Sequence, residues 1–413
     1  MGDPYSIAST TNVIDATLFS TQVTASQWLP RAHNALYQNS KDIVTQSVNG
    51  GSVPASFSNL GETLLTYNIE SIGDRLGNCY LALVLPAVTP GSTATYTRFV
   101  DYAALSMIAR IELNYNSRNI KTFYPTEMFL NQLKLSRPDF AKFQEYLHGG
   151  LTPAQRNTEA ASTSRWFIPL WMYWLWFNQQ APLLSGLVNK LQIRVVLNPT
   201  GEFVQTDNTT NLSVGITSAD LKMDVITDLD EMRAVMIGQS KDPKGITMLI
   251  RDFQFDQPSA VIPAGTTSYT FQPRAINSAT ATIYCLFRLA SLVDTSYSKE
   301  PWQLSSAQLP GLFSASSNGS STLLREQRVE FQTLKEMFDK WSGDKLPIVQ
   351  YSWAEVPEQP NSASGEVNFG NLSNITFTFT WDTATTADIR LYFGADIANY
   401  VQMQGGNLIK MFN

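Results

Sequence analysis

Apolar and polar residues alternate along several stretches of the chain, as they do in a strand with one face in a core. The cleanest alternation runs from Ile375 to Trp381, where every second residue is Thr. The same period of two is found around Leu65 to Ile69, Met107 to Tyr115, Leu191 to Leu197, Leu221 to Val225 and Ile389 to Phe393. We therefore expect a predominantly β protein.

Three runs are apolar at nearly every position and predict strands that are buried on both faces. Two of them are residues 79–88 and 282–293, and the third is WFIPLWMYWLWF at 166–177, with seven aromatic residues in twelve positions. This third run is shorter than the ~18 residues of a membrane span, and Pro169 favours an extended segment over a helix. No Lys or Arg lies between Trp166 and Gly186, so a core or subunit interface is favoured over a base-stacking platform.

Helical signals are few. Apolar residues at helical spacing, ending before Gly149-Gly150, predict a helix over roughly 126–148. Asp228, followed by Glu231, predicts the N-cap of a short helix that ends near Ile237.

Irregular segments divide the chain. Residues 1–60 lack a sustained period and predict an extended arm, and the sequence SASSNGSST at 314–322 predicts a flexible loop. The polar stretch 238–245 predicts a domain boundary.

Short sequences in the first half recur in the second half in the same order. Cys79-Tyr80-Leu81 is echoed by Tyr284-Cys285-Leu286, Ile120 with Glu127-Met128-Phe129 by Val329 with Glu336-Met337-Phe338, and Ile193-Arg194-Val195 by Ile389-Arg390-Leu391. The nearly constant separation predicts two similar β units in tandem. Many short strands with a helix inserted at the same place in each half fit a sandwich or a jelly roll.

Composition indicates extensive contact with other protein surfaces. Charged residues make up only 15% of the chain, the formal net charge is −6 and the pI is about 5.1. A surface with few charges suits a protein that is buried against copies of itself, and the acidic balance argues against direct nucleic-acid binding. The N-terminus has no secretory signal, so we expect a soluble, non-secreted chain.

Candidate chemistry is sparse. His33 and His148 are the only histidines, too few for a cupin-like metal site, and no G-x-S-x-G elbow or phosphate-binding loop occurs. Asp228, Asp230 and Glu231 could be offered as metal ligands, but helix capping explains them without a metal. We therefore expect no catalytic residue, no cofactor and no metal site. Two further features are Cys79 and Cys285, which are expected to be buried thiols, and Gly2, which fits a loose myristoylation pattern.

Five segments resemble the double jelly-roll major capsid proteins of large icosahedral DNA viruses, of the nucleocytoplasmic large DNA virus type. They are MIARIELNYNSRNIKTFYPTEMFLNQL (107–133), the block 165–197 with its Pro-Leu-aromatic and Leu-Pro-Leu sequences, LKMDVITDLDEMRAVM (221–236), the block 349–379 with Ser364-Gly365 and Asn368-Phe369, and the tail NYVQMQGGNLIKMFN (399–413). The chain departs from the family pattern at Asn116-Ser117, Ala363 and Gly370-Asn371, which makes it a divergent member by this resemblance.

The resemblance implies an all-β fold of two tandem eight-stranded jelly-roll barrels with short helical insertions. The expected division is an arm at 1–60, a first jelly roll at 61–227, a helical connector at 228–245 and a second jelly roll at 246–413. It also implies a homotrimeric, pseudo-hexagonal capsomer in the capsid of a virion that is assembled in the host cytoplasm. The implied partners are neighbouring capsomers, penton and minor capsid proteins and an inner membrane, which the arm could contact.

Two other classes of protein fit parts of the sequence. A jelly-roll carbohydrate-binding or attachment protein, such as a spike or penton component, would share the strand pattern but would form a monomer or pentamer. A hydrolase or metalloenzyme would require turnover or a bound ion.

Overall fold

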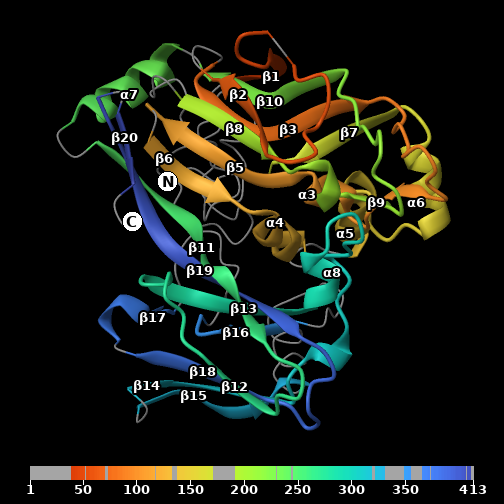
Figure 1. The fold of residues 1–413 in the computed structure, drawn as a ribbon. Helices are drawn as coiled ribbons and strands as arrows, with labels where there is room; N and C mark the ends of the chain where they lie inside the picture. Colours follow the sequence, from red (N-terminus) through yellow and green to blue (C-terminus); the bar gives the residue numbers. More distant parts are fainter. Residues whose placement is uncertain are drawn as a thin grey trace, which may run out of the picture.

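A computed structural model shows two β barrels, one from each half of the chain (Figure 1). The structure describes residues 39–410 except 52, 70–72, 117, 133–136, 171–190, 229, 243–244, 319–320, 331–347, 355–364, 373 and 406. Among these residues no helix is long and apolar enough to cross a membrane.

The first barrel is made of two four-stranded antiparallel sheets. One sheet has the order β1-β10-β3-β7, from Asn39–Ser47, Ser218–Asp228, Arg75–Leu85 and Ser164–Pro169. The other has the order β2-β8-β5-β6, from Thr63–Asn68, Leu191–Leu197, Ile108–Tyr115 and Arg118–Phe123. A separate pair, β4 (Thr97–Phe99) and β9 (Val204–Thr206), lies beside them.

The second barrel repeats this arrangement. Its first sheet has the order β11-β19-β13-β16, from Ile246–Ile262, Ile389–Gln404, Ala279–Leu289 and Val349–Ser352, with β17 (Val367–Asn368) and β20 (Asn407–Lys410) attached. Its second sheet has the order β12-β18-β14-β15, from Ser268–Phe271, Ile375–Thr380, Leu312–Ser317 and Ser321–Arg328. When the eight main strands of each half are taken in chain order, the same positions pair in both halves. Both are therefore jelly rolls, as the sequence predicts.

Helices occupy the connections. Among the described residues between β3 and β8, the helices are α3 (Ala103–Ser106), α4 (Pro125–Gln132), α5 (Arg137–Tyr146) and α6 (Pro153–Ala160). The single helix predicted at 126–148 is thus two helices, and Pro138 lies in the first turn of the second one, where proline is tolerated. Thr152 and Gln155 form a capping box at the start of α6, a signal that the sequence analysis missed.

The barrels are joined through α7 (Asp230–Lys241), which begins two residues after Asp228 and runs beyond the predicted end at Ile237. Asp228 itself is the last residue of β10, where it pairs with Asn39. Arg233 of α7 forms a two-pronged ion pair with Asp74, at 2.8 and 2.9 Å, which attaches the connector to the first barrel. This geometry is the stronger kind of Arg–carboxylate contact.

Two predictions about irregular segments are wrong. Residues 39–47, expected in the arm, form strand β1 and pair along their whole length with β10. Of residues 314–322, expected to be a loop, 314–317 lie in β14 and 321–322 lie in β15, and Asn318 after β14 has φ +51°. The polar sequence concealed both strands. Most of β1 is exposed, and the inward positions of β14 after Phe313 are the small residues Ala315 and Ser317, which give no apolar signal.

Each barrel has its own apolar interior. That of the first barrel includes Leu81, Ile193 and Leu221, and that of the second includes Phe287, Phe377 and Leu391. Burial alternates along β18 as predicted, with Ile375, Phe377 and Phe379 facing inward. Such alternation places about half of each strand's side chains outside its barrel, where they can form other contacts.

Candidate functional site: the junction between the barrels

Polar side chains from both barrels meet in a buried cluster between them. Lys121 of β6 places its Nζ 3.0 Å from Glu127 Oε1 of α4 and 3.0 Å from Asp252 Oδ1 of β11. Lys410 of β20 contacts the other oxygen of Asp252. All but Lys410 are almost fully buried, with exposed side-chain fractions of 1% for Lys121, 7% for Glu127 and 4% for Asp252. The cluster therefore links the two barrels through buried charges, and the loss of any one of them would leave the others without compensation.

The two carboxyl groups of this cluster differ in their pKa values. Burial raises the pKa of Glu127 to about 7, because Lys121 offsets only part of the cost of burying the charge. Burial also acts on Asp252, but Lys121 and Lys410 outweigh it and lower the pKa of Asp252 to about 2. Asp252 thus stays ionised at neutral pH, while Glu127 titrates there.

A second contact comes from residues 295–304, which follow the short helix α8 (Ala290–Asp294) of the second barrel and lie against the first barrel. We call this segment the strap. The backbone N–H of Tyr297 donates to the carbonyl of Gly201 at 2.9 Å, and that of Thr206 donates to the carbonyl of Tyr297 at 3.1 Å. A Cβ on Gly201 would lie 3.2 Å from the Tyr297 ring, so glycine permits this close approach.

Charged and aromatic side chains complete the contact of the strap. Glu300 accepts a 2.8 Å bond from Arg156 of α6, and Lys299 lies 2.6 Å from Glu202. The indole N–H of Trp302 donates to Ser106 Oγ at 2.8 Å, and its ring packs at 4.9 Å from that of Phe129. Trp302 is only 7% exposed and belongs to the apolar core of the first barrel.

Arg288 of β13 lies in the same junction between two aromatic rings. Its guanidinium carbon is 4.7 Å from the Trp302 ring and 4.5 Å from that of Tyr392. Burial lowers the pKa of Arg288. Its Nε and Nη2 atoms have no hydrogen-bond partner among the described residues, so the two rings supply the stabilising contact for this cation.

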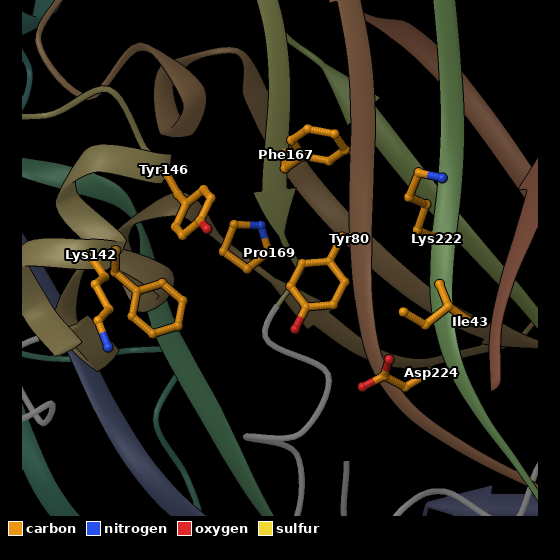
Figure 2. A pocket seen from close by; sticks show the side chains of 9 residues that line it. Ile43, Tyr80, Lys142, Tyr146, Phe167, Pro169, Lys222 and Asp224 are labelled. Atoms are coloured by element: carbon orange, nitrogen blue, oxygen red, sulfur yellow. The ribbon is translucent and has the colours of Figure 1, made fainter. Parts of the chain in front are cut away.

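A groove lies on the outer face of the β1-β10-β3-β7 sheet, on the first barrel (Figure 2). Its volume is about 460 Å³, and its lining residues are Ile43, Tyr80, Lys142, Phe143, Tyr146, Phe167, Pro169, Lys222 and Asp224. Figure 2 shows the rings of Tyr80, Tyr146 and Phe167 gathered around Pro169, with Lys222 and Asp224 on the adjacent strand. The groove is apolar at its centre and charged at its margin.

The aromatic run that begins at Trp166 divides between core and groove. Trp166 is fully buried, stacks on His148 at a ring distance of 3.6 Å and meets Phe99 edge-on at 5.2 Å. Its core placement is confirmed. The prediction that this run is buried on both faces is wrong at Phe167, which is 41% exposed. Residues 171–177 of the run lie outside the described residues.

The two other runs predicted to be buried on both faces differ from each other. In β3 the burial alternates, and Tyr80, Ala82 and Val84 are only half-buried, so that prediction is wrong. In β13 every residue from Thr282 to Arg288 is buried, so the prediction is confirmed for that part of the run. It is wrong for residues 290–293, which lie in a short helix (α8) with no buried residue.

Other predicted positions carry little chemistry. His148 pairs with Glu159, with 3.0 Å between Nδ1 and Oε1, and His33 lies outside the described residues. The side chains of Asp228, Asp230 and Glu231 are also outside the described part, as is Gly2. Cys79 and Cys285 are buried free thiols, and burial raises the pKa of both. Within the described residues no three His, Cys, Asp or Glu side chains are grouped as a metal site would require.

Two jelly rolls of the same strand order, packed together in one chain, define the double jelly-roll fold. Solved structures with this shape include a chain of the PBCV-1 virus capsid, with a TM-score of 0.71, 16% identity and coverage of 94% of this chain and 100% of that one. The Faustovirus major capsid protein gives a TM-score of 0.66 at 11% identity, with 96% and 94% coverage. A chain of the Sputnik virophage gives 0.56 at 10% identity, with 95% and 91% coverage. No protein-family model and no curated protein sequence matches the chain.

Proposed function

We propose that this chain is a major capsid protein, a structural subunit that assembles as a homotrimer into pseudo-hexagonal capsomers of an icosahedral virion shell. The observation that carries the proposal is the pairing of two equivalent barrels by a buried junction. Three such chains around a three-fold axis supply six similar units, which can tile a hexagonal lattice. The likeness in fold to the PBCV-1 capsid chain and the Faustovirus major capsid protein supports the same role.

The junction suits a mechanical role. Its ion pairs, strap and buried aromatic rings fix one barrel against the other, so the spacing of the two units is set before assembly. The structures of similar shape are a virus capsid chain and a major capsid protein, which supports a protein that is not an enzyme. We propose the virion as its location, with penton and minor capsid proteins and an inner membrane as further partners, and no direct contact with nucleic acid.

We propose the same connector as above, residues 228–245, and the same second structural unit, residues 246–413. The first unit includes strand β1 and therefore begins by residue 39. This division follows the pairing of strands, since the main strands of each barrel pair only within it.

Light scattering on the purified chain tests the proposal. A capsomer gives three times the chain mass of 46.0 kDa, and negative-stain images show particles with a three-fold centre and a pseudo-hexagonal outline. A stable monomer or a pentamer would contradict the proposal and would favour the attachment or penton class.

A further inference from the structure

The two sheets β1-β10-β3-β7 and β11-β19-β13-β16 can be aligned residue by residue. Cys79 and Cys285 occupy the third strand of their barrels, and each lies in the apolar interior of its own barrel. The residues that follow them, Tyr80 and Leu286, therefore point away from that interior. Tyr80 lies opposite Lys222 in the register of the first sheet, and Leu286 lies opposite Tyr392 in that of the second.

The alignment extends to the edge strands. Two residues beyond the positions of Lys222 and Tyr392, Asp224 pairs with Ile43 in the first sheet and Gly394 pairs with Phe255 in the second. The outward residues Ile43, Tyr80 and Lys222 of the first sheet thus correspond to Phe255, Leu286 and Tyr392 of the second.

In the second sheet these outward positions are covered by the first barrel. Leu286 has no exposed surface and belongs to the apolar core that is continuous with the first barrel. Phe255 stacks on Tyr124 of the first barrel at a ring distance of 6.0 Å. The outer face of this sheet is therefore an interface between barrels.

In the first sheet the corresponding face carries exposed apolar side chains. Ile43 is 65% exposed, Tyr146 of α5 is 55% exposed and Phe167 is 41% exposed, and all three line the groove of Figure 2. Large apolar side chains grouped at a groove with a charged margin are typical of a protein–protein interface.

We propose that this outer face of the β1-β10-β3-β7 sheet is the docking surface for the second barrel of another copy of the chain. The inference rests on the proposed capsid function and names the surface that builds the trimer. In a closed ring of six similar barrels, each contact between chains repeats the contact within a chain. The second barrel of one copy therefore covers the first barrel of the next, in the way that the first barrel covers the β11-β19-β13-β16 sheet.

The contact is head-to-tail, because the two surfaces that meet are different. Such a contact closes into a ring only if its rotation fits a whole number of copies. The β12-β18-β14-β15 sheet lies on the side of the second barrel that faces away from the junction (Figure 1). In space this sheet and the β1-β10-β3-β7 sheet with its groove lie on opposite sides of the molecule. Each chain thus offers one surface of either kind to its neighbours, as a ring requires.

The first experiment measures the mass of groove variants by light scattering and sedimentation. The double variant Ile43→Lys with Phe167→Lys places two charges on the exposed face, where neither side chain belongs to the barrel interior. We expect association weakened by at least about 30-fold, as for the loss of a central interface contact, with an unchanged thermal unfolding temperature. Val261→Lys is the matched control, because Val261 is also 41% exposed but lies on β11, and it remains a trimer.

A second measurement uses the unmodified chain and does not depend on a variant that folds. Tyr146 is 55% exposed and Tyr96 is 38% exposed in the single chain. In the assembled form, hydroxyl-radical footprinting is expected to modify Tyr146 less than Tyr96, which reverses the order of their exposure.

The outcomes separate this inference from the function on which it rests. A trimeric wild type whose double variant is also trimeric, or whose Tyr146 is modified more than Tyr96, overturns the docking surface and leaves the capsid role intact. A wild type that stays monomeric at high concentration overturns both.

Discussion

Strands β3 and β13 occupy the same position in two barrels of the same topology, yet their surroundings differ. In β3 only one face is buried, whereas β13 is buried on both faces because the first barrel packs against its outer side. Tyr80 is half-buried where its counterpart Leu286 has no exposed surface. The comparison shows that burial of a strand in this fold depends on the neighbouring barrel as much as on its own.

Removal of the shared cation of the junction should have the largest effect on stability. Lys121→Ala leaves Glu127 and Asp252 without the ammonium between them, and we expect about 3–5 kcal/mol less free energy of unfolding. Arg328→Ala is the control, because its pair with Asp382 is more than half exposed on both sides and such pairs contribute about 0–1 kcal/mol. Chemical denaturation measures the free energy of unfolding of both variants. Equal losses would contradict a larger contribution of the buried junction than of an exposed ion pair.

Truncation of the two equivalent outward residues sharpens the comparison between the sheets. Leu286→Ala should lower the free energy of unfolding by about 2–5 kcal/mol at any protein concentration, because it opens a cavity inside the chain. Tyr80→Ala should instead weaken association of the chains. Unfolding curves recorded at two concentrations distinguish these results, and a concentration-dependent effect of Leu286→Ala would contradict the assignment.

The pH dependence of the junction follows from Glu127. Its pKa is about 7 in the folded chain, against an ordinary value of 4.5, so the folded chain binds more protons than the unfolded chain between these values. Stability is therefore present in full below pH 4.5 and falls as the pH rises to about 7, by on the order of 3 kcal/mol from this group. The sign is opposite for Asp252, whose pKa of about 2 makes stability increase as the pH rises from 2 to 4.

Glu127→Gln tests this dependence. The amide has the shape of the protonated carboxyl group and does not titrate, so thermal unfolding of the variant should vary less between pH 5 and pH 7 than that of the wild type. An identical slope in both proteins would assign the dependence to another group.

A smaller effect is expected at Gly394, the counterpart of Asp224. A Cβ at Gly394 would lie 2.3 Å from Cζ of Phe253, so the ring could not keep its place across the second sheet. Gly394→Ala should cost about 1–3 kcal/mol as an overpacked site. Gly238→Ala in α7 is the control, because a Cβ at Gly238 would meet no atom within 4 Å, and an equal loss of stability there would argue against crowding at Gly394.

The sequence predicted the regular strands better than their surroundings. The alternation from Ile375 to Trp381 identified β18 because one face meets a core and the other does not. The polar strand β1 was missed because, of its residues, only Ile43 and Val44 are apolar, and Ile43 points out of the barrel.

The repeated sequences give a mixed result. Cys79 and Cys285 lie in equivalent strands, but Ile193 is in β8, the seventh main strand of its barrel, and Ile389 is in β19, the eighth of its own. The echo of Glu127-Met128-Phe129 is not tested, since Glu336-Met337-Phe338 lies outside the described residues. The prediction of two tandem β units is therefore correct, although only some of the sequence matches behind it join equivalent strands.

The junction itself could not be read from the sequence. Lys121 and Asp252 lie far apart in the chain, and each occupies a position that resembles an ordinary polar residue of a surface strand. Trp302 stands alone in a connecting segment without periodicity. Only the packing of one barrel on the other shows that these side chains are buried.

The central claim is that the outer face of the first sheet is covered by a neighbouring copy, as the outer face of the second sheet is covered within the chain. Electron cryo-microscopy of the purified oligomer tests this claim most directly. The account predicts three chains in a closed ring, with the second barrel of each against Ile43, Tyr146 and Phe167 of the next. A ring that leaves this face open to solvent, or that joins two such faces to each other, would contradict it.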